Sequence, residues 1–125
     1  MPQAAHGNLC GVFPSNGRPH IVTGGGLRNY VDERNKTFIF DIDGDQPKWR
    51  PGPDYPFPVS KTSSVPFKDT FLVVGGFGIR SGAFYNAIHE FDPLNEKWIR
   101  RPEKLAVGKR GVAPVMIGDN VFQCK

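Results

Sequence analysis

Short apolar runs, separated by polar segments rich in glycine and proline, recur along this chain of 125 residues. Two of these runs, residues 20–23 and 70–74, are each followed by a pair of glycines. Both contain mainly β-branched and aromatic residues, and a continuous apolar run bounded by glycine is typical of a strand buried on both faces. The pattern therefore predicts an all-β chain.

The same order of landmarks occurs twice, about fifty residues apart. The paired landmarks are residues 20–25 with 71–76, Phe40-Asp41 with Phe91-Asp92, Trp49 with Trp98, and Lys61 with Arg110. The first two pairs are 51 residues apart and the last two are 49 apart. Four landmarks in one order at one period mark a structural repeat, and repeats of this length are typical of stacked units such as propeller blades.

Each copy divides into four predicted strands, with a long polar loop (26–36 or 77–86) between the first strand and the second. In the first copy the later strands are expected at 37–41, 48–50 and 61–67. In the second copy they are expected at 87–91, 97–100 and 110–117. Residues 6–13 fit the last strand of a preceding unit, and 119–125 fit the beginning of another. The predicted units are therefore 6–13, 20–67, 70–117 and 119–125.

The landmarks resemble those of the Kelch repeat family, in which an apolar run ending in Gly-Gly precedes an aromatic-Asp pair, a Trp and an Arg. The second copy has all four, at Gly75-Gly76, Phe91-Asp92, Trp98 and Arg110. The first copy has Lys61 in place of the Arg, and both copies have Phe where the family usually has Tyr.

This resemblance covers about residues 6–122 and implies one four-stranded antiparallel blade per repeat, arranged around a central channel. Closed rings need about four to eight blades. The fold expected is therefore a partial β-propeller of two Kelch blades plus flanking strands, in which Trp49 and Trp98 pack between blades and Asp41 and Asp92 cap turns.

The composition restricts the classes of partner. The net charge of +4 comes from scattered basic residues, with a dense group only within 100–110. No aromatic side chains are interleaved with that group, so a nucleic-acid partner is not expected. The apolar run 71–74 is far too short to cross a bilayer. The N-terminal residues lack a basic cap followed by an apolar run, which favours the cytoplasm. The sequon at Asn35 matters only if the chain is exported.

Two segments have a superficial likeness to ligand-binding loops. Residues 41–45 have the acidic character of a calcium loop, which needs glycine at its sixth position and glutamate at its twelfth. Here glycine is fourth and the twelfth residue is Gly52, so a turn between strands is favoured. Residues 75–78 resemble a dinucleotide loop, but counted from Gly76 the third glycine, Gly82, is one residue late. Helical spacing within 84–91 would suit an α/β fold; the β-type matching segment 37–41 favours a strand.

No catalytic constellation is evident. The three histidines are widely separated, Cys10 and Cys124 lie at opposite ends of the sequence, and no Gly-x-Ser-x-Gly motif occurs. We therefore expect neither a cofactor nor a metal, and no enzymatic activity. A fragment of a galactose-oxidase-like propeller enzyme, or a non-functional remnant, stays open as an alternative.

The resemblance implies a non-catalytic module that presents its inter-strand loops to a protein partner, as substrate adaptors and actin-associated members of the family do. Loops held by a rigid scaffold commonly carry binding residues. The candidate partner-binding residues are Arg28, Tyr30, Arg80 and Arg110. Two blades alone would leave outer faces uncovered, so self-association is a further expectation.

Overall fold

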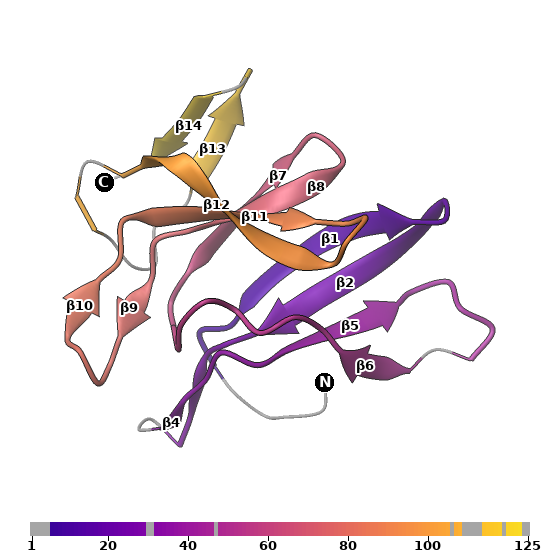
Figure 1. Cartoon of the computed structure of the whole chain (residues 1–125), viewed down its shortest axis with the longest axis horizontal. Helices are drawn as coiled ribbons and strands as arrows, with labels where there is room; N and C mark the ends of the chain where they lie inside the picture. The colour runs from indigo at the N-terminus through magenta and orange to yellow at the C-terminus, as the bar shows by residue number, and fades with distance from the viewer. Residues whose placement is uncertain are drawn as a thin grey trace.

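In a computed structural model of the chain, the described residues are 6–29, 32–46, 48–105, 107–108, 114–118 and 120–123. They form antiparallel sheets and no helix (Figure 1). The first sheet, in spatial order, consists of β1 (Leu9–Ser15), β2 (Arg18–Gly24), β5 (Thr37–Asp41) and β6 (Trp49–Pro51). The second consists of β7 (Ser63–Phe67), β8 (Thr70–Val74), β11 (Ala87–Asp92) and β12 (Lys97–Lys104).

Three two-stranded hairpins complete the described fold: β3 (Leu27–Arg28) with β4 (Asp32–Glu33), β9 (Phe77–Gly78) with β10 (Ala83–Phe84), and β13 (Pro114–Ile117) with β14 (Asn120–Gln123). The all-β prediction is confirmed. An α/β fold would need a helix within 84–91, but this segment contains the strand β11. Residues 42–46 form turns and bends, as expected.

The grouping of strands differs from the sequence prediction. The segment 61–67 was expected to complete the first repeat, but its strand β7 pairs with β8 of the second. Two-residue turns at 16–17 and 68–69 explain the difference, because they force the strands on either side to pair. The eleven residues 52–62 contain three prolines and form no continuous ladder with β6. The sheets therefore span 9–51 and 63–104.

The register of the repeat also differs by one residue at the glycines. Gly25 and Gly26 have φ angles of 61° and 84°, and Gly75 and Gly76 have 67° and 116°. The residue after each pair bridges an earlier segment, Leu27 to His6 and Phe77 to Ser60. Gly25-Gly26 is therefore the equivalent of Gly75-Gly76, a separation of 50 residues instead of 51.

The Phe-Asp and Trp landmarks of the two copies are equivalent as predicted, whereas the pair of Lys61 with Arg110 stays a prediction because Arg110 lies outside the described residues. Phe40 pairs with Trp49 across β5 and β6, and Phe91 pairs with Trp98 across β11 and β12. Asp92 accepts backbone hydrogen bonds from Leu94 and Asn95 in the turn that follows it. Asp41 likewise accepts one from Asp43. The expectation that both aspartates cap turns is confirmed.

The main core lies between the two sheets. We call the face of the first sheet that meets the second sheet its leading face. The leading face contributes Leu9, Phe13, Val22 and Ile39 to the core. We call the opposite kind of face, with which the second sheet meets the first, its trailing face. The trailing face of the second sheet contributes Phe71, Val73, His89, Phe91 and Trp98. The Phe13 and Phe91 rings lie 4.8 Å apart between centroids, and a Cβ on Gly11 would collide with the Phe71 ring. Gly11 therefore permits the close approach of β1 to β8.

A strap formed by residues 52–62 closes one side of this core. Tyr55 and Val59 are buried in it, and the indole N–H of Trp98 donates a 3.1 Å hydrogen bond to the Pro53 carbonyl. Packing of Trp98 between the sheets is thus confirmed. Trp49 lies on the other, trailing face of the first sheet, where its ring contacts that of Phe40 in a tilted arrangement, so its role between blades stays a prediction.

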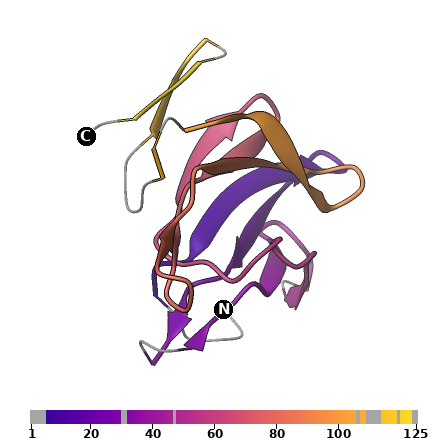
Figure 2. The ribbon, with the colours of Figure 1, turned by 60° about the vertical axis from the view of Figure 1, so that its left-hand side comes forward.

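The C-terminal hairpin β13–β14 lies beyond the second sheet, near β7, so that hairpin, second sheet and first sheet are stacked in order (Figures 1 and 2). The leading face of the second sheet forms a separate cluster of buried apolar residues, against which Leu105 packs: Val65, Phe67, Leu72, Val74 and Ile88.

Candidate functional site

The long loops predicted to carry binding residues each contain a short hairpin. In β3–β4, Arg28 pairs with Asp32 and Leu27 with Glu33. In β9–β10, Phe77 pairs with Phe84. Both hairpins lie at the same end of the molecule, opposite the tight turns of the sheets (Figure 1). We call this region the hairpin end, residues 26–29, 32–36 and 77–86.

A buried carboxylate joins the two hairpins. Glu33, with 7% of its surface exposed, accepts hydrogen bonds from the Ile79 N–H at 3.0 and 3.1 Å. The hydroxyl of Ser60, which is fully buried, donates to the same carboxylate at 2.9 Å. Ser60 also exchanges backbone hydrogen bonds with Phe77. The first hairpin, the strap and the second hairpin are thus held together at one point.

Two of the four predicted site residues lie at this end. Arg28 is exposed on β3, and Arg80 is exposed in the turn between β9 and β10, directly after Ile79. Because Glu33 binds the Ile79 N–H, the structure brings these two arginines onto adjoining hairpins although they are 52 residues apart. Tyr30 and Arg110 lie outside the described residues.

The same hairpin as Arg80 carries an exposed aromatic residue that was not among the predicted site residues. Phe84 is 52% exposed on β10, and its ring lies 5.2 Å from that of Phe77. Behind this hairpin, Tyr85 packs against Phe57 of the strap, with ring centroids 4.2 Å apart. The sequence signal that could have identified Phe84 is an aromatic residue within a polar, glycine-containing loop. The site therefore presents two guanidinium groups and one apolar ring.

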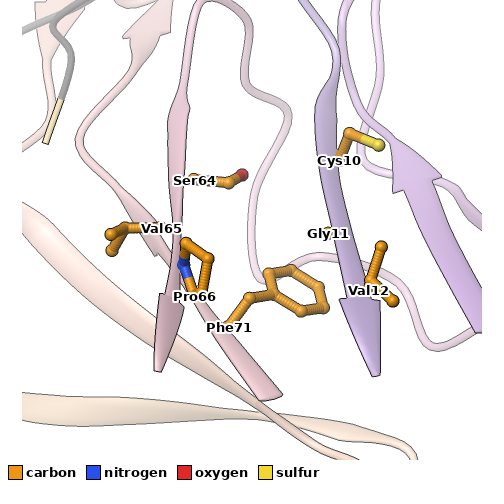
Figure 3. A pocket seen from close by; sticks show the side chains of 7 residues that line it. All are labelled: Cys10, Gly11, Val12, Ser64, Val65, Pro66 and Phe71. Atoms are coloured by element: carbon orange, nitrogen blue, oxygen red, sulfur yellow. The ribbon is translucent and has the colours of Figure 1, made fainter. Parts of the chain in front are cut away.

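A groove of about 290 Å³ lies between β1 and β7 and is lined by Cys10, Gly11, Val12, Ser64, Val65, Pro66 and Phe71 (Figure 3). Partial burial raises the pKa of the Cys10 thiol, which disfavours the reactive thiolate. Ser64 offers the other side-chain polar atom in this apolar lining. This groove lacks the convergent polar groups of a catalytic centre.

Within the described part of the chain, no group of three or more His, Cys, Asp or Glu side chains is placed to hold a metal ion. The same residues include no helix that is long and apolar enough to span a membrane. The sequon residue Asn35 uses its side-chain amide to donate a 3.1 Å hydrogen bond to the Tyr55 carbonyl.

Comparison with known proteins supports the fold. No protein-family model matches the sequence, and no curated protein matches it. Among solved structures, the chain is similar to the structure of YjhT, with a TM-score of 0.74 and 16% sequence identity. The match covers 98% of this chain and 34% of that one, so the chain spans about a third of the length of this structural relative. At this identity the likeness shows a shared fold.

The carboxylate of Glu33 makes a testable contribution to stability. We expect Glu33→Gln to lower the free energy of unfolding by about 1–3 kcal/mol, because an amide supplies one acceptor oxygen and brings a donor next to existing donors. Urea-induced unfolding followed by tryptophan fluorescence measures the loss. Glu103→Gln is the matched control, since Glu103 lies at the surface beside Arg101. Equal unfolding curves for wild type and Glu33→Gln would contradict the assigned role.

Proposed function

We propose that this chain is a non-catalytic protein-interaction module built from two blades of a Kelch-type propeller. Three observations support the proposal: the Gly-Gly, Phe-Asp and Trp landmarks occur in the same order in both copies, each copy contributes to a four-stranded antiparallel sheet, and the sheets stack face to face. The likeness to a solved structure three times as long is consistent with part of a larger assembly of such sheets.

The observation that carries the proposed binding surface is the pairing of two hairpins at one end. Both follow a left-handed glycine pair, so they occupy equivalent positions in the two copies. Exposed Arg28, Arg80 and Phe84 project from them. Arginine and aromatic residues are enriched in protein–protein interfaces. Arginine also forms strong two-point hydrogen bonds with carboxylates. The chemistry fits an acidic peptide segment that contains an apolar residue.

The anchoring of the hairpins favours recognition by a preformed surface. Glu33 and Ser60 fix β3–β4, the strap and the Ile79 backbone at one point. A surface that is ordered before binding avoids part of the entropy cost of ordering its loops on association. The two sheets behind it share one core, so the hairpins rest on a rigid support.

Selection of peptides against the immobilised chain, followed by calorimetry with the best binder, tests this proposal. We expect Arg28→Ala and Arg80→Ala each to weaken binding about 5- to 30-fold, equivalent to about 1–2 kcal/mol. Lys97→Ala is the control, because Lys97 is an exposed cation at the start of β12, next to a turn at the opposite end. The proposal fails if no peptide is selected, or if selected peptides bind both arginine variants as tightly as the wild type.

A further inference from the structure

The two defining residues of the sequon, Asn35 and Thr37, hold the strap in place. The Asn35 side-chain amide donates to the Tyr55 carbonyl at 3.1 Å, and the Asn35 carbonyl accepts the Tyr55 N–H at 2.7 Å. The Thr37 hydroxyl donates to the Pro53 carbonyl at 2.6 Å, and the Thr37 carbonyl accepts the Gly52 N–H at 2.9 Å. Both residues that define the sequon are therefore engaged by the strap, through side chain and backbone alike.

The second copy has the same asparagine at the same place. Asn86, like Asn35, directly precedes the residue whose carbonyl accepts the N–H of the first glycine of the pair. The Asn86 carbonyl accepts the Leu105 N–H at 2.8 Å, which repeats the bond between Asn35 and the Tyr55 N–H. Two residues after Asn86 stands Ile88, so the second copy has no sequon. The asparagine thus serves the repeat, and the sequon arises because the first copy adds a threonine.

We infer that N-glycosylation of Asn35 and docking of the strap exclude each other, so that Asn35 accepts a glycan only while the strap is off the core. The donor would be an oligosaccharide linked to a lipid through pyrophosphate. Asn35 Nδ2 bonds to C1 of the first sugar, the bond from C1 to the pyrophosphate oxygen breaks, and one amide proton leaves to solvent. This inference does not rest on the function proposed for the hairpin end.

The docked strap blocks both groups that the transfer needs. Nδ2 of Asn35 lies at hydrogen-bond distance from the Tyr55 carbonyl, which leaves no room for a sugar between them. The Thr37 hydroxyl belongs to a residue with 2% of its surface exposed. A chain glycosylated before the strap docks would keep the strap away, and it would lose the hydrogen bond from the Trp98 indole to the Pro53 carbonyl. The modification would therefore favour the open form of the core.

The time at which an oligosaccharyltransferase is added tests the inference. The enzyme and the lipid-linked oligosaccharide are present either during cell-free synthesis of the full chain or only after the chain has folded. Mass spectrometry should show modified Asn35 in the first case and at least about 10-fold less in the second, because only the open fraction reacts.

Lys97→Thr supplies the matched control, because it places a sequon at Asn95. The Asn95 amide also donates a hydrogen bond, to Asp92, but Asn95 is exposed in the turn before β12. We expect Asn95 of this variant to be modified both during synthesis and after folding. Equal modification of wild-type Asn35 in the two cases, or none in either, overturns the inference.

A second readout needs no enzyme. Asn35→Asp keeps the size of the side chain but sets an acceptor against the Tyr55 carbonyl. Hydrogen exchange of the Tyr55 amide should then accelerate on the order of 10-fold, because the strap opens more often. Asn16→Asp, in the exposed turn between β1 and β2, should leave that rate unchanged. If Asn35→Asp also leaves it unchanged, the sequon does not hold the strap and the inference fails.

Discussion

Phe91→Ala is expected to lower the free energy of unfolding by about 3–5 kcal/mol, the usual cost of removing a fully buried aromatic side chain. Phe91 has no exposed surface, and its ring contacts three others, with centroids 4.8 Å from Phe13, 5.6 Å from Phe71 and 5.2 Å from Trp98. Phe13 belongs to the first sheet, so the substitution opens a cavity between the two sheets. Denaturant titration of the purified chain measures the loss.

The equivalent landmark of the first copy supplies the control. Phe40 has the same place in the repeat, and its ring centroid lies 4.9 Å from that of Trp49, but Phe40 is partly exposed on the trailing face. Phe40→Ala should therefore cost about 1 kcal/mol, because a partly solvated ring loses less transfer free energy. Equal losses from the two variants would show that burial between sheets does not distinguish them.

The part of the fold that the sequence could predict is the part encoded locally. Apolar runs ending at glycine, Phe-Asp pairs and tryptophans located most strands of both sheets. The grouping of strands was wrong because it depends on which connection is tight, and the short turn at 68–69 attaches β7 to β8. The glycine register was wrong because the sequence has three consecutive glycines, and φ angles show that Gly25 and Gly26 are the equivalent pair.

The candidate site was only partly predictable, since its organisation depends on contacts between distant segments. Arg28 and Arg80 could be selected as basic residues in long loops. Glu33 could not, because its partners Ser60 and Ile79 lie 27 and 46 residues away in the sequence. The hairpins themselves are only two residues per strand, too short to show alternation.

Another long-range pair, Tyr55 with His89, affects how the stability of the fold depends on pH. The Tyr55 hydroxyl and His89 Nδ1 share a 2.9 Å hydrogen bond in the core, and the Tyr55 and Trp98 rings lie 5.0 Å apart. Burial is the main cause that lowers the pKa of His89 from 6.5 to about 4, and the nearby Arg100 charge lowers it further. Burial also raises the pKa of Tyr55, so both groups are neutral near pH 7 in the folded chain.

Acid should therefore destabilise the fold through His89. Between pH 6.5 and about 4 the unfolded chain protonates this imidazole while the folded chain does not. The free energy of unfolding is then highest above pH 6.5 and falls as the pH decreases toward 4, with His89 contributing up to about 3 kcal/mol of the change. Below pH 4 both states are protonated and this contribution to the slope ends.

A pair of variants isolates this contribution without leaving a hydroxyl unpaired. Tyr55→Phe retains His89, and Tyr55→Phe with His89→Phe places at position 89 the residue that stands at the equivalent position 38 of the first sheet. The single variant should keep the loss of stability between pH 6.5 and 4, because burial and Arg100 remain. In the double variant, the free energy of unfolding should change much less between pH 6.5 and 4. If both unfold with the same pH dependence over this range, His89 is not the titrating group, and the acid sensitivity of the core arises elsewhere in the chain.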